Sequence, residues 1–453
     1  MGYILIHPDD NVRVNLENGH KYAVRDIAKG EKIIKYGFPI GIATEDIPNG
    51  GHIHSHNMKT ALSGAQEYTY TPDFKFLEEE KPQIIKAYIR KNGDIGIRND
   101  IWIIPTVGCV NKTAEKIASL TGAFAFTHPY GCSQLGGDHE RTRKILCSLI
   151  KHPNAGGVLV LGLGCENNNI TELKKVLGEY DEERIRFLNA QDYEDEITEG
   201  VKIIDELKRI AAKDKRTEVP VSKLKIGLKC GGSDGLSGIT ANPLCGRITD
   251  RLVSMGGTAV LTEVPEMFGA EQILMNRCVN EDVFNRTVKL INDYKEYFIS
   301  NGQPVSENPS PGNKEGGITT LEEKSLGCVQ KGGTAPVTAV LDYGDTAREK
   351  GLNLLNGPGN DMVAVTNLTA AGCHLILFTT GRGTPLGAPI PTIKIATNSD
   401  LKEKKTHWID FDAQKGNEEE LLNLILEIAN GKETKNEENG YREIAIFKDG
   451  VTL

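Results

Sequence analysis

The sequence lacks the features that mark membrane, secreted and nucleic-acid-binding proteins. No apolar run approaches the roughly 18 residues needed to span a bilayer. The N-terminal segment MGYILIHPDDNVRV has no basic stretch followed by a long apolar one. With 53 basic and 62 acidic residues the net charge is −9, and the sequence contains no cluster of basic residues. These absences predict a cytoplasmic protein whose partners include neither a membrane nor a nucleic acid.

Paired cysteines and nucleotide-binding loops are missing as well. The nine cysteines are an odd number, are scattered along the chain and include no CxxC pair, which disfavours a disulfide scaffold and a structural zinc ribbon. The pattern GxxxxGK[ST] is absent, and no GxGxxG follows a first strand and opens a helix. A reducing compartment fits this usage, with some thiols free to pack or to bind metal.

The chain has 453 residues, which is enough for two or three domains. Short β-like runs separated by Gly, Asp and Pro predict a small all-β domain over residues 1–75, and residues 76–99 are interpreted as a linker. Over residues 100–453 apolar strands alternate with amphipathic helices, which is typical of an α/β fold with a mostly parallel sheet covered on both faces. Two subdomains are expected there, over about residues 100–220 and 221–453.

Polar and sulfur-bearing residues gather where the predicted strands end. Six such clusters contain Cys109, His128 to Cys132, Cys165 with Glu166, Cys230 to Asp234, Glu263, and Gly381 to Gly387. In open parallel sheets, ligands bind beyond the carboxyl ends of the strands. The six clusters are therefore expected to form one assembled site.

Four of these strand ends carry a cysteine next to a glycine. Thiolates are soft ligands for iron or zinc, and four of them together can hold a cluster or a single ion, whereas a lone buried cysteine usually only packs. The repeated position favours a metal role for this set, which consists of Cys109, Cys132, Cys165 and Cys230.

The stretch KCGGSDGLSGITANP, Lys229 to Pro243, is the most unusual of the clusters, because its four glycines allow backbone to approach a ligand closely. We expect Cys230 and Asp234 to face a metal or its water. The side chains expected to bind substrate hydroxyls are Ser233, Ser237, Thr240 and Asn242.

The segment GHIHSHN places His52, His54 and His56 at alternate positions. In a strand these three imidazoles would share one face and suit a divalent metal or an anion. A solvated polar face is an equally good interpretation. This segment is therefore kept as an alternative metal site.

Proton transfer and carboxylate binding have candidates in other segments. His128 and Glu263 lie at strand ends, where a tuned pKa would suit acid–base catalysis; a hydrogen-bonded core histidine and a helix cap are the alternatives. The loops NPSPGNKEGG and TTGRGTPLG carry Lys314 and Arg382, and such glycine-rich loops with a cation suit phosphate or carboxylate.

Several long motifs resemble those of the altronate and galactarate dehydratase family, which also includes the sulfolactate sulfo-lyases. They run from IHPDDNVRV near the N-terminus to REIAIFKDGVTL at the C-terminus, and include RNDIWIIPTVGCVN, HPNAGGVLVLGLGCENN, CGGSDGLSGITANP, VLTEVPEMFGAEQ and FTTGRGTPLGAPIPTIKIATNS. The stretch around Asn15 to Gly19 looks shorter than is usual in this family.

The resemblance implies an N-terminal SAF-type β-clip domain and a Rossmann-like α/β region. It also implies iron-dependent loss of water from a sugar acid, D-altronate, giving 2-dehydro-3-deoxy-D-gluconate. The expected cofactor is Fe²⁺, with Mn²⁺ as a substitute or an iron–sulfur cluster as the alternative, and a homodimer is expected. On this reading His128 or Lys394 is the base, Glu263 is the acid or a metal-orienting carboxylate, and Arg382 with Lys314 and Thr384 binds the substrate.

Other functions stay open on the same residues. Galactarate dehydration and loss of sulfite from sulfolactate use the same scaffold, although the fused N-terminal domain favours altronate. A protein that binds sugar acids without catalysis is the remaining alternative, and the filled cysteine, histidine and glutamate positions disfavour it.

Overall fold

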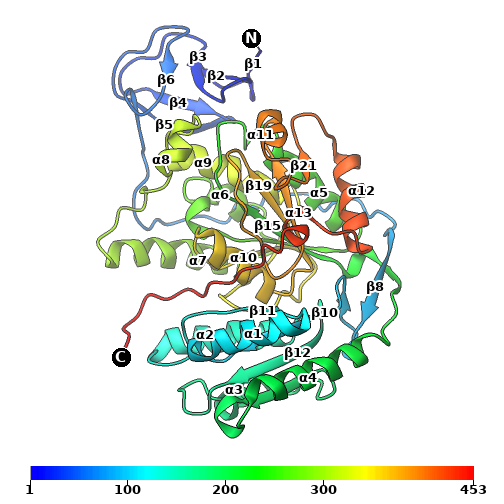
Figure 1. Ribbon diagram of the computed structural model, residues 1–453. Coiled ribbons are helices and arrows are strands. Elements are labelled where there is room, and N and C mark those ends of the chain that lie inside the picture. Colours follow the sequence, from blue (N-terminus) through cyan, green and yellow to red (C-terminus); the bar gives the residue numbers. More distant parts are fainter. Residues whose placement is uncertain (1) are drawn as a thin grey trace.

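The computed structural model describes residues 2–453 and arranges them in three parts (Figure 1). A small β domain formed by the N-terminal residues packs on a large central α/β domain, and a smaller α/β domain lies at the opposite end. None of the helices in the described residues is long and apolar enough to cross a membrane.

The N-terminal domain contains two antiparallel sheets, ordered β1-β2-β3-β6 and β4-β5-β7. Alternate residues such as Val12 and Val14 are buried, as a half-buried strand requires. Its core is continuous with that of the central domain. The strands are β1 (Tyr3–Ile4), β2 (Val12–Asn15), β3 (Lys21–Ala23), β4 (Lys32–Lys35), β5 (Phe38–Ala43), β6 (His52–Ile53) and β7 (Met58–Lys59).

Residues 60–83 contain no helix or strand, but they are fastened to the central domain. Tyr68 donates a hydrogen bond from its hydroxyl to Glu271 (2.6 Å), and Tyr70 donates one to the carbonyl of Cys278 (2.8 Å). The chain then forms β8 (Ile84–Ile89) and β9 (Ile95–Gly96), which join β14 (Thr217–Pro220) in a three-stranded sheet. The predicted linker of residues 76–99 thus contains two strands, because its alternate residues Ile85 and Ala87 are buried.

The smaller α/β domain has a four-stranded parallel sheet in the order β11-β10-β12-β13. All eight residues of β12 are buried, as expected for a strand that is covered on both faces. The strands are β10 (Asp100–Pro105), β11 (Phe124–Ala125), β12 (Ala155–Gly162) and β13 (Ile185–Asn189). The helices are η1 (Gly108–Val110), α1 (Asn111–Thr121), α2 (Gly136–Ile150), α3 (Ile170–Leu177), η2 (Ala190–Asp192) and α4 (Glu196–Ala211).

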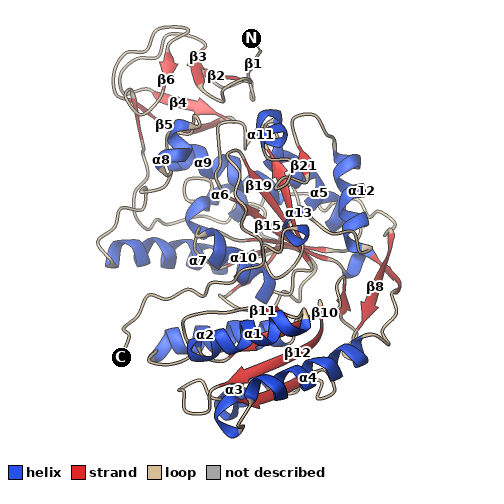
Figure 2. Ribbon diagram, viewed as in Figure 1, coloured by secondary structure: helices blue, strands red, loops and turns tan. Residues whose placement is uncertain are grey.

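The central domain has a seven-stranded parallel sheet in the order β17-β18-β16-β15-β19-β20-β21, with helices on both faces (Figure 2). Its strands are β15 (Lys225–Cys230), β16 (Thr258–Leu261), β17 (Val337–Leu341), β18 (Gly351–Leu355), β19 (Leu375–Thr380), β20 (Thr392–Ala396) and β21 (Phe411–Asp412). Its helices are η3 (Val221–Lys223), α5 (Ala241–Ser254), η4 (Val264–Met267), α6 (Glu271–Met275), α7 (Glu281–Ser300), α8 (Pro311–Glu315), α9 (Leu321–Cys328), η5 (Val329–Gly332), α10 (Asp361–Ala370), α11 (Ser399–Lys404), α12 (Glu418–Ala429) and α13 (Lys435–Glu438).

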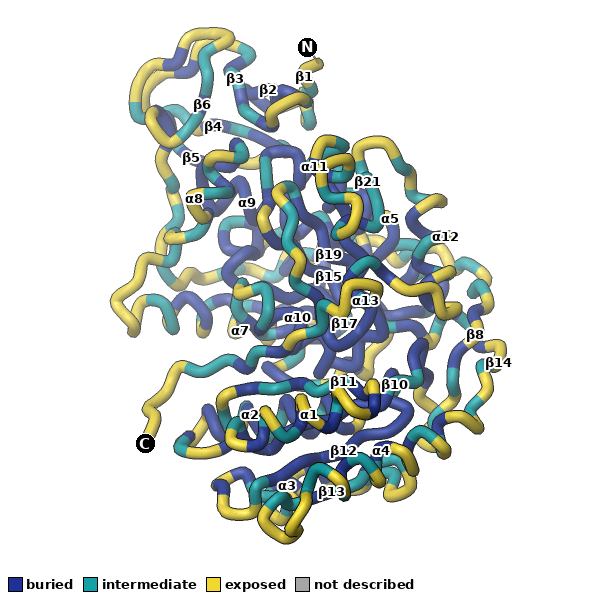
Figure 3. Tube along the Cα trace, in the orientation of Figure 1, coloured by how far each residue is buried: buried dark blue, intermediate teal, exposed yellow. Residues whose placement is uncertain are grey.

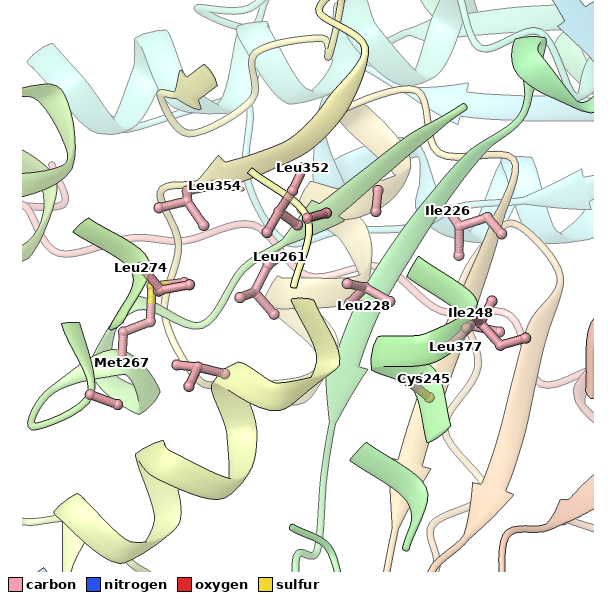
Figure 4. Close-up of a cluster of buried hydrophobic side chains, with 14 of the residues drawn as sticks. Ile226, Leu228, Cys245, Ile248, Leu261, Met267, Leu274, Leu352, Leu354 and Leu377 are labelled. Atoms are coloured by element: carbon pink, nitrogen blue, oxygen red, sulfur yellow. The ribbon is translucent and has the colours of Figure 1, made fainter. Parts of the chain in front are cut away.

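The core lies on both faces of this sheet. On one face Leu228 and Leu377 pack with Ile248 of α5 (Figure 4). On the other face Ile376 and Phe378 belong to a second cluster that includes residues of α10. The strands of the sheet are buried along most of their length, whereas exposed residues concentrate on the outer helices and loops (Figure 3). The predicted α/β fold with an N-terminal β domain is confirmed.

The C-terminal segment returns from the central domain to the smaller one. Thr452 forms an isolated bridge with Gln134, and the backbone amides of Asp449 and Gly450 donate to the carboxylate of Asp138. The end of the chain therefore lies beside the loop that precedes α2.

Candidate functional site

The strand-end clusters, which the sequence predicted to form one assembled site, follow strands of two different sheets. Cys109, His128 and Cys165 follow strands of the four-stranded sheet, whereas Cys230 and Glu263 follow strands of the seven-stranded sheet. Hydrophobic periodicity identifies strands but does not say which sheet each one joins. Two separate carboxyl edges must therefore be considered.

At the edge of the seven-stranded sheet, two cysteines and a glutamate form a compact buried group. The Sγ atoms of Cys230 and Cys328 lie 3.4 Å apart, and each lies close to Oε2 of Glu266, at 3.1 and 3.2 Å. Among the described residues these are the three whose metal-ligating atoms all lie within 4.8 Å of one another. The expected partners of Cys230, the cysteines at positions 109, 132 and 165, are not part of this group.

Lysines already neutralise the negative charge of this buried group. Lys331 donates to Sγ of Cys230 (2.8 Å), and Lys324 pairs with Glu266 (2.8 Å). The hydrogen bond with Cys328 lowers the pKa of Cys230 to about 6, and the neighbouring ammonium groups also favour the thiolate. Because the whole group is buried and charge-compensated, it does not offer an open metal position to a substrate.

A second ion pair lies beside it, between Lys229 and Glu263. Their side chains contact directly, the amide of Cys230 donates to Oε2 of Glu263 (3.0 Å), and Lys229 also reaches Asp361 (2.9 Å). Glu263 has φ 71°, a left-handed conformation that is costly for a non-glycine residue. Burial beside Cys230 and Glu266 raises the pKa of Glu263. Asp361 is 37% exposed and is the member of this chain of contacts that reaches solvent.

Lys394 lies on the same face of the sheet as Lys229. The strand register pairs Lys229 with Phe378 and Phe378 with Lys394, so the aromatic ring lies between the two ammonium groups. The Nζ atom of Lys394 lies 3.8 Å from the ring centroid and donates to the carbonyl of Thr384 (3.1 Å). Burial lowers the pKa of Lys394 to about 7, which is the range of a general base at neutral pH.

The loop Lys229 to Pro243 is stabilised mainly by hydrogen bonds within itself and with Thr397 and Asn398, which follow β20. The carboxylate of Asp234 accepts from Ser237 (2.9 Å), Thr397 (2.8 Å) and Asn398 (3.1 Å), as well as from a backbone amide. This carboxylate is buried and already has four protein donors. The structure therefore argues against the expected role of Asp234 as a metal ligand.

Three of the expected hydroxyl-binding side chains are also engaged within the protein. Ser237 donates to Asp234, Thr240 donates to the carbonyl of Thr397 (2.8 Å), and the amide of Asn242 donates to the carbonyl of Gly327 (3.0 Å). These contacts give Ser237, Thr240 and Asn242 a structural role. Ser233 lines a cavity of about 10 Å³, which is enough for one water molecule.

The glycines of this loop allow it to pack closely against the N-terminal domain. A Cβ atom at Gly235 would lie 2.0 Å from the carbonyl oxygen of Gly19, so only glycine permits this approach of the N-terminal domain. This stretch therefore contacts the N-terminal domain at Gly235.

His128 does not lie at this edge. It is buried in the smaller α/β domain, where Nε2 lies 2.8 Å from the carbonyl oxygen of Pro105 and Nδ1 accepts from the amide of Tyr130 (3.2 Å). Burial lowers its pKa to about 4. Both ring nitrogens are occupied, so the structure favours the alternative of a hydrogen-bonded core histidine over a base.

Four imidazoles, which we call the histidine cluster, gather on the N-terminal domain: His20, His52, His54 and His56. Nδ1 of His20 lies 3.0 Å from Nε2 of His52, and the rings of His52 and His54 stack with centroids 5.8 Å apart. Burial and the neighbouring imidazoles lower the pKa of His52 to about 4. The cluster is only partly buried, so small ligands can reach it.

The histidine cluster faces α8 of the central domain. Nε2 of His54 lies 2.8 Å from the carbonyl oxygen of Lys314. Glu315, the next residue, binds Arg382 (2.9 Å), so the two predicted cationic loops come together here. Lys314 and Arg382 thus lie near the histidines, while Thr384 lies farther along the loop toward Lys394.

A buried triad holds the two domains together. Glu323 of α9 pairs with Lys21 (2.8 Å) and Lys35 (2.9 Å), and all three side chains are at most 1% exposed. Burial alone would raise the pKa of Glu323, but the two ammonium groups lower it to about 2. The N-terminal domain is therefore fixed over the carboxyl edge of the sheet by desolvated charge pairs.

The cysteines of the smaller domain form a distinct feature. Cys109, Cys132 and Cys165 are all exposed, and they follow β10, β11 and β12, which are adjacent strands.

A cleft of about 1130 Å³ lies elsewhere, near the amino-terminal ends of β15, β18 and β19, and none of the predicted site residues lines it.

Sequence reasoning missed several residues of the site, notably His20, Lys229, Cys328 and Lys331. One signal was present. Lysines inside apolar runs, as in KIGLKC, and the charges of LEEKSLGC are unusual in segments that are buried, and they indicate internal ion pairs.

Comparison with known families covers almost the whole chain. Residues 11–61 match the Altronate/galactarate dehydratase SAF domain, and residues 87–212 match the D-galactarate dehydratase/Altronate hydrolase second domain. Residues 221–452 match the D-galactarate/Altronate dehydratase C-terminal domain.

Individual relatives agree with the family models. The chain is 53% identical to altronate dehydratase of Bacillus subtilis, over 98% of this chain and 93% of the relative, and 51% identical to altronate dehydratase of Escherichia coli over the full length of both. Galactarate dehydratase (L-threo-forming) of Escherichia coli is 30% identical over 98% of this chain and 96% of its own length. The chain therefore belongs to the altronate/galactarate dehydratase family.

Proposed function

We propose that this protein is a hydro-lyase that removes water from D-altronate and gives 2-dehydro-3-deoxy-D-gluconate. The main support is its identity of 51–53% over nearly the full chain to relatives named altronate dehydratase, against 30% to one named galactarate dehydratase. The structural observation that supports the chemistry is a buried amine, Lys394, with a pKa of about 7 at the carboxyl edge of the central sheet.

The reaction needs a base that takes the C2 proton. Lys394 suits this role because its fully buried amine contacts the carbonyl of Thr384 and the ring of Phe378, and because burial outweighs the influence of Asp361 and Asp410 and leaves the amine partly neutral at pH 7. A well-placed base contributes roughly 10²- to 10⁴-fold in rate. His128, the other base expected from the sequence, is enclosed in another domain.

Loss of the C3 hydroxyl needs a proton donor. Glu263 is 1% exposed and holds Lys229, which in turn contacts the partly exposed Asp361. We assign Glu263 to positioning Lys229 through their ion pair, while Lys229 and Asp361 face the reacting groups. This assignment keeps the acid separate from the base, Lys394, on the other side of Phe378.

The substrate carboxylate needs cations at the edge of the site. Arg382 and Lys314 lie on loops that meet at α8. Arg382 donates to the exposed carboxylate of Glu315 (2.9 Å), which a substrate carboxylate can replace, and more weakly to the carbonyl of Gly312 (3.5 Å). The guanidinium offers two parallel donors to such a group. Negative charge that develops on the carboxylate as C2 loses its proton is stabilised there.

Iron(II), with manganese(II) as a substitute, fits the histidine cluster better than it fits the buried sulfur atoms. Imidazole suits divalent iron, and the partly exposed His20 and His52 bring two ring nitrogens within 3.0 Å of each other. The ring nitrogens of three histidines do not all lie within 4.8 Å of one another, so His54 would have to leave the carbonyl of Lys314 and turn toward the iron. When bound there, iron supplies a Lewis acid for the substrate carboxylate and hydroxyl. The group of Cys230, Glu266 and Cys328 is sealed and already neutralised by lysines.

The test is an anaerobic assay of the iron-loaded full chain against altronate, galactarate, mannonate and sulfolactate, followed by detection of the 2-keto product or of sulfite. Turnover of altronate with kcat/KM at least about tenfold above the others is expected, since contacts to hydroxyl groups discriminate at least that strongly. A preference for galactarate would identify a galactarate dehydratase, and release of sulfite would identify a sulfolactate sulfo-lyase; either result would contradict the proposal. Binding without turnover would identify a non-catalytic sugar-acid-binding protein. The homodimer and the cytoplasmic location stay predictions that gel filtration with light scattering and cell fractionation can test.

A further inference from the structure

The exposed cysteines of this protein are unusually distributed. All nine cysteines are free thiols, and six of them are buried, in keeping with the usual behaviour of this residue type. The other three, Cys109, Cys132 and Cys165, are exposed. All three follow adjacent strands at the same edge of the four-stranded sheet. Exposed thiols that gather at one edge are better explained by a ligand than by packing.

The three cysteine loops are fastened to one another by their backbones. The amide of Gly108 donates to the carbonyl of Tyr130 (2.8 Å), and the amide of Asn168 donates to the carbonyl of Gly131 (2.9 Å). These bonds link the Cys109 loop to the Cys132 loop and the Cys132 loop to the Cys165 loop. The thiols are therefore carried on one connected framework rather than on independent loops.

Backbone geometry around Cys132 also indicates a constrained site. A Cβ atom at Gly131 would lie 2.0 Å from the carbonyl oxygen of Thr106. The Cys132 loop and the Cys109 loop therefore approach each other so closely that only glycine fits at position 131. Ser133, the next residue after the cysteine, has φ 60°, which is unfavourable for a side chain of its type. Strain of this kind is typical of functional sites.

The side chains near the thiols are amides. Sγ of Cys132 lies 3.4 Å from Oδ1 of Asn167, and Nε2 of Gln191 donates to Sγ of Cys165 (3.5 Å). The nearby Glu166 is buried and accepts from Thr106 and from two backbone amides, so it shapes the Cys165 loop and is not free to bind a metal.

As they stand, the three thiols are not all within 4.8 Å of one another, as the ligands of a single ion would be, whereas a multi-iron cluster accepts thiolates that lie farther apart. Ligands of one zinc or iron ion lie within about 4 Å of one another, because each bond is about 2.3 Å long. Among residues 2–453, the group that meets such a limit is Cys230 with Glu266 and Cys328, and the three exposed thiols do not form another. Thiolates of an iron–sulfur cluster bind different iron atoms and are spaced more widely.

We propose that Cys109, Cys132 and Cys165 hold a [4Fe–4S] cluster at the carboxyl edge of the smaller α/β domain, with the fourth iron free of protein thiolate and open to an exogenous oxygen ligand. This inference goes beyond the proposed function, which places its iron at the histidine cluster. It also removes Cys230, which lies in another sheet, from the set of four cysteines considered from the sequence.

The experiment uses the full chain, purified anaerobically and treated with ferrous iron and sulfide before desalting. Iron, acid-labile sulfide, visible absorption and the EPR spectrum after reduction are measured for the wild type and for Cys109→Ser, Cys132→Ser and Cys165→Ser. Because these thiols are exposed, the substitutions leave the core unchanged, which circular dichroism checks. Cys147→Ala, which alters a buried cysteine of α2 in the same domain, is the matched control.

The wild type and Cys147→Ala are expected to carry about four sulfides per chain and the EPR signal of a reduced cluster, and each serine variant is expected to lose at least half of both. Iron without sulfide in the wild type, or a cluster that persists when all three cysteines are replaced, would overturn the proposal. The result is independent of the proposed function, because sulfide and EPR report the cluster, whereas altronate turnover in the presence of ferrous iron reports the reaction.

Discussion

Lys229 and Lys394 lie on either side of the ring of Phe378, on one face of the central sheet, and the pKa values of their ammonium groups shift in opposite directions. Burial lowers the pKa of both, but Glu263 and Asp361 outweigh it for Lys229 and raise its pKa above the ordinary value. Within residues 2–453 Lys394 forms no ion pair, and although Asp361 and Asp410 raise its pKa from farther away, burial outweighs them and its pKa falls to about 7. One lysine is thus kept protonated and its neighbour is free to accept a proton, which is the pattern expected of an acid–base pair.

Replacing Lys394 by Met is expected to lower kcat by at least about 100-fold, as loss of a general base does. In the wild type kcat should rise as the pH rises through about 7, because only the neutral amine can take a proton and its fraction grows in that direction. Measuring kcat of the iron-loaded wild type and variant over a range of pH tests both the loss of rate and the pH profile. Lys350→Met alters another partly buried lysine with a lowered pKa, near the amino-terminal edge, and should keep the wild-type profile. A Lys394→Met enzyme with near-normal turnover would remove this residue from the mechanism.

Glu263→Gln is expected to reduce both stability and activity. The change keeps the shape of the side chain but leaves Lys229 buried with only Asp361 as a charged partner, and breaking a buried pair costs about 3–5 kcal/mol. Urea unfolding followed by fluorescence gives the stability, and turnover is measured well below the new midpoint. Adding Lys229→Met should recover stability but not activity. Full activity in the single variant would show that Glu263 does not position Lys229.

Glu323→Gln is expected to loosen the N-terminal domain, because Lys21 and Lys35 would lose their shared carboxylate. The folded-state pKa of Glu323 lies below its ordinary value, so its stabilising contribution is present above about pH 4.5 and is lost as the pH falls toward 2. The difference in unfolding free energy between wild type and variant should therefore be about 3–5 kcal/mol at pH 7 and shrink below pH 4.5. Glu403→Gln, in an exposed pair with Lys415, is the control and should change little. A difference that grows on acidification would contradict this account.

His20→Ala and His52→Ala should each weaken binding of ferrous iron by about tenfold or more and lower kcat in parallel, since even residues behind the metal ligands contribute that much. Iron retention during dialysis against a weak chelator, with sulfide measured alongside, gives the affinity. His407→Ala, an exposed histidine beside Trp408, should leave it unchanged. Equal iron retention in all variants would place the catalytic iron elsewhere.

The elements of the fold were largely predictable because their hydrophobic periods are clear, as in the runs that form β12 and β19. Their division into two sheets was not, because no local pattern distinguishes a strand such as β10 from β15. For the same reason Cys230 was grouped with Cys109 although Cys328, 98 residues later, is its neighbour. The prediction of Lys394 as a base rested on the family resemblance, because nothing in the segment TIKIA indicates that its lysine is reactive. His128 looks polar and accessible in the sequence, and only the tertiary structure shows that it is buried with both ring nitrogens bonded, which favours the alternative of a core histidine.

Helix α9 connects the N-terminal domain to the charges of the reaction site through consecutive residues. Glu322 binds the hydroxyl of Thr60 and the amide of Ala61, Glu323 binds two lysines of the β domain, and Lys324 binds Glu266. A chain that began after residue 61 would therefore expose two acidic side chains without partners on the helix that also carries Cys328. The β domain thus supplies the counter-charges of the helix that carries Cys328, and a protein assembled from separately expressed halves would need both halves before these contacts could form.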